Sequence, residues 1–276
     1  GSGAAAEGGA GGAAEGCDAP SAEAAGLGAP LLLGASAAPA APPPPSPGSG
    51  SGSAPRLRCS AGMGALCAAH CGYGFLVAGG AELFPLFASA PRPEGLGLTA
   101  DQTGFALSPL SLGLIAASLS FPLLAARHGP AAVYRAAAGL YFFSNVLMPQ
   151  LTSAQRLGAL PLWASVVAIS LVRSLGGPLG FPALAVLLNA ALAVGERPRG
   201  LWNGIASSCL AAGRAAAPIA VGSVWSLALR HSGKPLESGG ARAWPWPVDY
   251  HLPFYLLCVV SVLCGLLSLR FPRAAL

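Results

Sequence analysis

Three charged residues stand alone inside long apolar stretches of this chain: Glu82, Arg173 and Arg214. A charge inside a membrane span is costly, so each is a candidate site for a solute or an ion. At about 1.5 Å per residue, Glu82 and Arg173 fall about 12 and 20 Å from the outer ends of their stretches. We therefore expect them to approach each other in the outer half of a cavity. A static ion pair that only holds two helices together is the alternative.

The overall composition places these charges in a membrane protein. Hydrophobic residues make up 54% of the chain and charged residues 9%, and the mean hydropathy is +0.61. A soluble domain has about 25% charged residues. Although the net charge is +5, the fifteen Lys and Arg are scattered singly, which argues against nucleic acid as a partner. The lipid bilayer is the expected partner.

The chain divides by composition near residue 60. Residues 1–60 are dominated by Ala, Gly, Ser and Pro and are predicted to be a disordered, low-complexity cytoplasmic tail or a central linker. Residues 61–276 are predicted to form a six-helix transmembrane bundle, because six apolar stretches there are long enough to cross a hydrocarbon core of about 30 Å. The stretches are Met63–Ala90, Gly104–Ala126, Ala131–Leu151, Leu160–Ala193, Leu201–Leu229 and Leu252–Leu269.

Six spans place both termini on one side of the membrane. Eight arginines lie on that side, against five basic residues in the opposite loops, so the positive-inside rule predicts cytoplasmic termini. The eight are Arg56, Arg58, Arg127, Arg135, Arg197, Arg199, Arg270 and Arg273. Vacuolar and plasma membranes both remain open as the location.

Glycine and proline cluster beside the charges of the first and fourth stretches. The predicted helix breaks are Gly79, Gly80, Pro85, Gly176, Gly177 and Pro178. Irregular backbone is tolerated in a membrane only against protein or a water-filled cavity. In an all-α fold of two inverted three-helix repeats these stretches hold equivalent positions, so both are expected to line a pathway.

The fifth stretch carries a second polar pair. Asn203 and Arg214 are eleven residues apart, so at about 100° per residue they fall on nearly the same helix face. For Arg214, a functional or gating role and a structural role as a cap on neighbouring carbonyls are equally open. Gly204, Ser208 and Ala212 form a second stripe, which is typical of close helix packing.

Enzyme and metal chemistry find little support. Cys67, His70 and Cys71 share a helix face, but no fourth ligand is spaced to complete a tetrahedral site, so a packing role is expected. Gly176 to Gly180 lacks the Lys-Ser/Thr that follows a phosphate-binding loop. We expect neither an enzyme, a cofactor nor a metal.

Several of these residues resemble a known family. The stretch Asn189 to Pro218, with Arg-Pro-Arg-Gly at 197–200, resembles the segment that joins the tenth and eleventh helices of major facilitator superfamily transporters. It is most similar to the zinc-induced-facilitator-like branch. Residues 82–86 (Glu-Leu-Phe-Pro-Leu) resemble the acidic turn of the seventh helix, and residues 249–254 the lead-in to the twelfth. Residues 127–129 (Arg-His-Gly) with Tyr134-Arg135 are similar to the basic loop between the eighth and ninth helices.

The resemblance covers residues 61–276 and implies the second six-helix half of a twelve-helix transporter. It implies alternating access for a small-molecule substrate, with proton coupling expected. A first six-helix half, from the same or a separate gene, or self-association would complete it. A truncated six-helix protein that does not transport and acts as an interaction scaffold is the alternative.

The resemblance also suggests roles for individual residues. Glu82 would be a protonatable coupling or substrate-binding carboxylate, and Arg173 its partner or a ligand for an anionic substrate group. Arg214 and Asn203 join them as substrate or coupling candidates. A cytoplasmic gate is implied for four arginines: Arg127, Arg135, Arg197 and Arg199.

Overall fold

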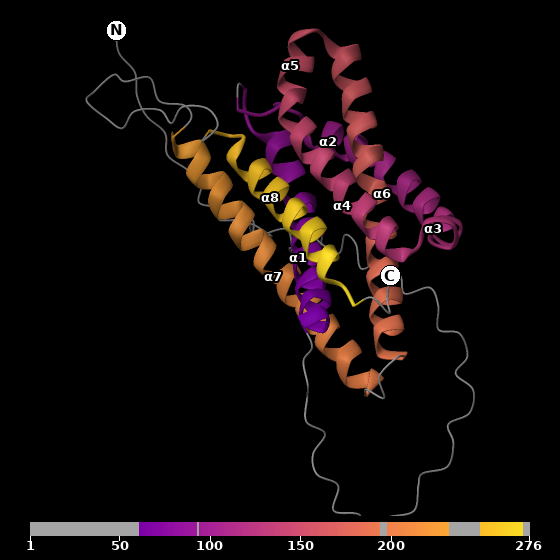
Figure 1. The fold of residues 1–276 in the computed structure, drawn as a ribbon. Coiled ribbons are helices and arrows are strands. Elements are labelled where there is room, and N and C mark those ends of the chain that lie inside the picture. Colours follow the sequence, from indigo (N-terminus) through magenta and orange to yellow (C-terminus); the bar gives the residue numbers. More distant parts are fainter. Residues whose placement is uncertain (1–60, 93, 194–197, 232–248, 273–276) are drawn as a thin grey trace, which may run out of the picture. The chain divides into compact units, whose positions relative to one another are not determined.

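The computed structural model describes residues 61–92, 94–193, 198–231 and 249–272, and every regular element in these ranges is helical (Figure 1). The helices are α1 (Ala61–Ser89), α2 (Ala100–Leu107), α3 (Pro109–His128), α4 (Pro130–Leu147), α5 (Leu151–Arg156), α6 (Ala159–Ala193), α7 (Arg199–His231) and α8 (Leu252–Leu267). Short 3-10 helices span Met148–Gln150 and Ser268–Arg270. The prediction of an all-α protein is confirmed for these residues. The predicted tail or linker at 1–60 lies outside them.

Five helical segments in the described ranges are long and apolar enough to cross a membrane. They are Ala61–Ser89, Ala100–His128, Ala159–Ala193, Arg199–Arg230 and Leu252–Arg270, and they match five of the six predicted spans. The sixth predicted span, Ala131–Leu151, overlaps α4, which is not among the five. Polar residues such as Arg135 and Asn145 make α4 less apolar. The count of six spans therefore stays a prediction.

Local sequence signals explain the boundaries around α2 and α3. Thr99 and Gln102 form a capping box at the start of α2, in which each side chain accepts a hydrogen bond from the other residue's backbone N–H. Pro109 has no N–H, so the helical hydrogen bonding is interrupted at Ser108, which nevertheless keeps helical dihedral angles. Gly129, with a φ of 79°, ends α3 and turns the chain directly into α4.

Contacts between helices give the direction of each. Along α1 and α7 the contacts advance together, because Gly74 lies against Leu210 and Gly79 against Val221, so the two helices are parallel. Along α1 and α6 they run in opposite senses, because Gly80 lies beside Arg173 and residue 73 beside residue 180.

The remaining long helices follow the same alternation. The Ser170 hydroxyl of α6 donates a hydrogen bond to the carbonyl of residue 106 in the α2–α3 segment, and Ser174 contacts Gly113. The contacts advance together, so this segment runs parallel to α6. Phe271 lies just after the C-terminal end of α8, and its ring centroid is 5.6 Å from that of Tyr134 at the start of α4. Cys258, near the start of α8, lies 3.8 Å from the carbonyl of residue 142. Thus α1, α4 and α7 run one way, and α3, α6 and α8 the other.

The expected breaks in α1 and α6 do not appear, and this corrects the sequence interpretation. Both helices are continuous, with Pro85 inside α1 and Pro178 inside α6. The glycines provide room instead. A side chain at Gly79 would meet α7 and α8, one at Gly80 would meet an arginine of α6, and one at Gly176 would meet an aromatic ring of α4. The ring beside Gly176 belongs to Tyr141, and a Cβ atom at Gly177 would lie 3.5 Å from the hydroxyl of that tyrosine.

Candidate functional site

The centre of the candidate site is Arg173, a buried cation on α6. Its side chain is 6% exposed. A Cβ atom built on Gly80 of α1 would lie 3.1 Å from one terminal nitrogen of the guanidinium and 3.3 Å from its central carbon. The arginine therefore lies against the backbone of α1, in space that a side chain at that position would crowd.

A cluster of aromatic side chains lies between α1, α4 and α6, and its member Tyr141 is within electrostatic range of the arginine. The Tyr73 hydroxyl on α1 donates to the Gly176 carbonyl on α6 at 2.7 Å. The ring of Tyr73 lies 5.8 Å from the Tyr141 ring and 5.2 Å from the Phe181 ring, both edge-on. Edge-to-face pairs at such distances are favourable. This cluster holds α1, α4 and α6 together beside the arginine.

A second cation approaches the same cluster from α7. Arg214 is half-buried, and its guanidinium carbon lies 4.9 Å from the centroid of the Phe181 ring, in a cation–π arrangement. The Tyr141 hydroxyl lies within electrostatic reach of both Arg173 and Arg214. Arg214 of α7 therefore contacts this cluster through Phe181, while Arg173 of α6 lies against α1 at Gly80.

Asn203 shares the α6-facing side of α7 with Arg214, as the spacing predicts. Its amide nitrogen lies 3.4 Å from the side-chain oxygen of Asn189 on α6. Because α6 and α7 are antiparallel, the pair Asn203–Asn189 sits at one end of their shared edge and the pair Arg214–Phe181 further along it. The prediction that these two polar residues lie on one face is confirmed.

Glu82 does not pair with Arg173. Gly80 faces the arginine, and Glu82 follows two residues later, about 200° further around α1 at about 100° per residue. Its side chain is exposed, on the side of α1 away from the aromatic cluster. The expected approach of Glu82 and Arg173 was therefore wrong in direction, although Gly80, two residues before Glu82, does lie beside the arginine.

The described residues include four carboxylates, and none of them neutralises either arginine. They are Glu82, Glu94, Asp101 and Asp249. The acid–base contact found among the described residues joins Asp249 to the His251 ring two residues later, at 2.6 Å, and is an ion pair when His251 is protonated. Within this part of the chain, Arg173 and Arg214 are therefore cations without an acidic partner.

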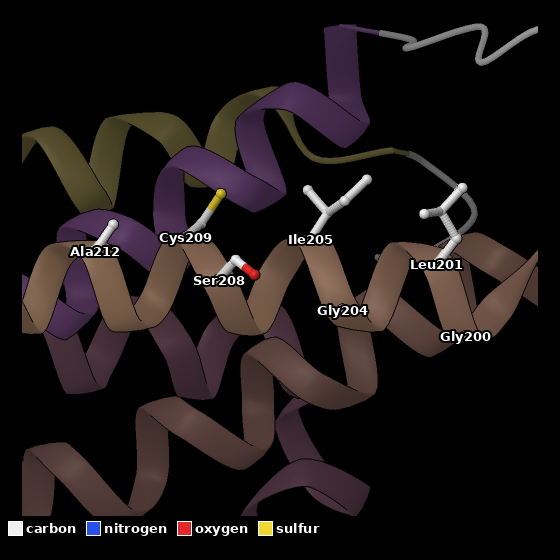
Figure 2. A pocket seen from close by; sticks show the side chains of 7 residues that line it. All are labelled: Gly200, Leu201, Gly204, Ile205, Ser208, Cys209 and Ala212. Carbon is white, nitrogen blue, oxygen red and sulfur yellow. The ribbon is translucent and has the colours of Figure 1, made fainter.

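An open groove runs along α7 on another side of the helix (Figure 2). Its volume is about 580 Å³, and its lining residues all belong to α7: Gly200, Leu201, Gly204, Ile205, Ser208, Cys209 and Ala212. A Cβ atom at Gly200 or Gly204 would touch nothing within 4 Å. The small-residue stripe Gly204, Ser208 and Ala212 is thus left uncovered by the described helices.

The predicted gate residues lie at one end of the helices. Arg127 near the end of α3, Arg135 in the first turns of α4 and Arg199 at the start of α7 are all exposed. None of them forms an ion pair with a described carboxylate. Arg197 lies outside the described residues.

His70, another side chain that could take part in chemistry, has a partner within its own helix. The Nδ1 atom of His70 lies 2.8 Å from the carbonyl of Leu66, one turn earlier in α1. The part of the chain that the structure describes contains no group of three His, Cys, Asp or Glu able to hold a metal. Cys67 and Cys71 are half-buried thiols on the same helix.

Sequence reasoning missed the aromatic members of the site. Tyr73, Tyr141 and Phe181 stand in apolar helices and look like ordinary core residues. The available signal was the hydroxyl group, because a buried tyrosine needs a hydrogen-bond partner. For Tyr73 that partner is a carbonyl on α6, which no spacing in the sequence indicates.

The helices and their buried charges define an integral, multi-pass membrane protein. Over 191 residues the chain is 28% identical to Protein ZINC INDUCED FACILITATOR-LIKE 1 of Arabidopsis thaliana. The match covers 68% of this chain and 37% of that relative. It confirms the predicted resemblance to the zinc-induced-facilitator-like branch. No protein-family profile matches the chain, and no solved structure matches it.

Proposed function

We propose that this chain forms one half of a transmembrane transporter that moves a small solute by alternating access. The observation that carries the proposal is the match to a protein named as a facilitator, of which this chain covers 37%. A half of this kind needs polar groups on membrane helices and uncovered faces for the other half. The described helices have both.

The helix contacts support a six-helix half built from two inverted repeats. The helices α3 and α6 are parallel, so the chain must return across the membrane between them, through α4. An inverted repeat would pair α1 with α6, α3 with α7 and α4 with α8. With this pairing, the most extensive contacts between helices of the bundle have counterparts between their paired helices. In this pairing α1 packs on α7 and α8, just as α6 packs on α3 and α4.

The groove on α7 is the proposed contact with a first six-helix half. Small residues such as Gly204, Ser208 and Ala212 let helix backbones approach closely in a membrane. Nothing in the described part of the chain covers them. A second copy of this chain is the competing occupant.

Glu82 is the proposed coupling carboxylate. An exposed carboxylate inside an apolar helix is costly against lipid, so its face of α1 is expected to meet water or protein. We assign this face to the solute pathway, with a proton as the coupled ion. Arg127, Arg135 and Arg199, with Arg197, would stabilise one state of the transporter at the cytoplasmic end.

Transport by vesicles tests the proposal. The protein is purified from its native membranes and reconstituted into vesicles with and without a supplied first half. A pH gradient is then imposed across the vesicle membrane. Accumulation of a solute that collapses with the gradient is the expected result. Absence of uptake in both preparations would leave an interaction scaffold as the function.

A matched pair of variants tests the proposed interface. Gly204→Leu fills the groove on α7 and should abolish co-purification of the two halves and solute uptake. Gly265→Leu makes the same change on α8, where a Cβ atom would meet nothing within 4 Å, and should change neither. If Gly204→Leu instead breaks a dimer of this chain, the second copy is the occupant.

A further inference from the structure

A small pocket at one end of the helix bundle is lined by two arginines from distant parts of the sequence. Its volume is about 150 Å³, and its lining residues come from the turn between α1 and α2 and from α5: Arg92, Gly95, Thr152, Gln155 and Arg156. Because α1 and α4 run in the same direction, the turn after α1 and the segment after α4 lie at the same end of the bundle. The pocket thus brings together two cations that the sequence keeps apart.

Backbone and side-chain contacts fix the shape of this pocket. The Nε atom of Arg92 donates a long hydrogen bond of 3.5 Å to the carbonyl of Leu96. A Cβ atom at Gly97 would lie 3.7 Å from the Arg92 Cγ atom, so the arginine folds back over its own turn. The same Leu96 carbonyl accepts a hydrogen bond of 2.7 Å from the side-chain amide of Gln155. This carbonyl therefore joins the two walls of the pocket.

Several hydrogen-bond donors of the pocket have no partner among the described residues. The bond to Leu96 uses only Nε of Arg92, which leaves both terminal nitrogens, and Arg156 makes neither a hydrogen bond nor an ion pair in this part of the chain. The amide of Gln155 keeps a second N–H. Glu94 does not line the pocket and pairs with neither arginine. Two positive charges with free donors make an anion the natural complement of the pocket.

The size and the position of the pocket restrict what that anion can be. At about 30 Å³ for each molecule, the pocket has room for about five waters, whereas pockets for organic ligands measure about 300–1,000 Å³. A phosphate group has this smaller size, and its oxygens can accept paired hydrogen bonds from two guanidinium groups. The pocket also lies just beyond the ends of membrane helices, since α1 ends at Ser89 and α6 begins at Ala159. Lipid headgroups are found at that level.

We propose that Arg92 and Arg156 bind one phosphate group, which belongs either to a membrane phospholipid or to free inorganic phosphate. Both sources present anionic oxygens to the arginines. The bound phosphate joins the turn after α1 to α5 and so stabilises this end of the bundle. The site does not depend on the proposed transport function, because its residues lie outside the helices that carry Glu82 and Arg173.

Binding to the intact protein tests the site and distinguishes the two sources. The protein is purified from its native membranes into a phosphate-free maltoside detergent and immobilised. Scintillation proximity then measures bound radiolabelled dioctanoyl phosphatidylglycerol and inorganic phosphate, with dioctanoylglycerol as the lipid without phosphate and acetate as a competing anion. We expect saturable binding of one phosphate-bearing ligand per chain and none of dioctanoylglycerol.

Each outcome of this assay bears on the proposal. Phospholipid binding that inorganic phosphate does not displace would identify a lipid headgroup as the ligand. Binding of inorganic phosphate without the lipid would identify free phosphate, and displacement of one by the other would show that both use the pocket. Saturable binding of neither ligand, or displacement by acetate as effective as that by phosphate, would overturn the proposal.

Variants assign the binding to the two arginines. Arg92→Gln and Arg156→Gln should each weaken phosphate binding about tenfold, equivalent to about 1.4 kcal/mol. Arg230→Gln is the matched control, because Arg230 is an exposed arginine near the end of α7, which runs parallel to α1, and it does not line the pocket. It should keep the native affinity. Each variant removes one positive charge, so equal weakening by all three would show non-specific attraction and overturn the proposal. Since Arg92 and Arg156 are exposed, both variants are expected to fold, and an unchanged Tm without phosphate checks this.

Discussion

Replacing Arg173 by methionine should stabilise the protein in the absence of added anions. Arg173 lies about 21 Å along α6 from Ala159, at 1.5 Å per residue, within the middle part of a 35-residue helix. Its guanidinium is buried, and no described carboxylate lies within 4 Å. Methionine keeps the unbranched shape of the side chain and removes the charge.

The expected magnitude follows from the cost of the unpaired charge. An arginine at the centre of a membrane helix costs about 3 kcal/mol on insertion scales, and replacing buried ionic groups by apolar ones often stabilises proteins by about 1–4 kcal/mol. We expect a gain within that range. For a domain of this size, each kcal/mol corresponds to roughly 2–4 °C in Tm.

Thermal unfolding in nanodiscs, followed by far-UV circular dichroism, measures the effect. Arg230→Met on the exposed end of α7 is the matched control. Its free energy of unfolding should change by no more than the roughly 0.5 kcal/mol that is usual for surface substitutions. A fall equivalent to about 3–5 kcal/mol for Arg173→Met would refute the reasoning. That loss is typical of breaking a buried ion pair and would reveal an acidic partner.

Three further changes test other parts of the site. Gly80→Ala places a methyl group 3.1 Å from a nitrogen of the buried guanidinium, so the Tm should fall in the unfolding assay, whereas Gly139→Ala on α4, which meets nothing within 4 Å, should leave the Tm unchanged. Glu82→Gln should abolish uptake driven by a pH gradient but retain solute exchange, whereas Glu94→Gln, between α1 and α2, should leave both activities unchanged. Unchanged gradient-driven uptake in Glu82→Gln would exclude the coupling role. Tyr73→Phe removes the 2.7 Å hydrogen bond to α6 and should lower stability by about 1 kcal/mol in the unfolding assay, and an unchanged Tm would show that the bond contributes nothing.

The sequence predicted the helices well because membrane spans depend on hydrophobic length. The positions of α1, α6, α7 and α8 follow directly from that length. The predicted span at α4 is harder to recognise, because some of its polar residues face the interior of the bundle. Tyr134 and Asn145 are buried there, so hydropathy underestimates how well this helix suits the protein core.

Contacts between helices were less predictable, because they depend on rotation about each axis. Depth along a helix can be counted in residues, and it placed Glu82 and Arg173 about 12 and 20 Å from the outer ends of their stretches. Rotation depends on packing, and the two-residue offset from Gly80 to Glu82 turned the carboxylate away. The glycines were misread for a related reason. Glycine weakens an isolated helix, but in a packed bundle a neighbouring side chain such as Tyr141 takes the space at Gly176 and the helix stays continuous.

The separation of Glu82 from Arg173 constrains how a proton and an anion can be coupled. If the two formed an ion pair, protonation of the carboxylate would release the arginine directly, and proton and solute would compete at one place. In this structure the carboxylate and the guanidinium lie on different sides of α1. A proton on Glu82 therefore affects Arg173 only by moving α1, which carries both Glu82 and the glycine beside Arg173. This arrangement suits alternating access, since a moving helix that contacts α6, α7 and α8 changes the site and the uncovered faces together.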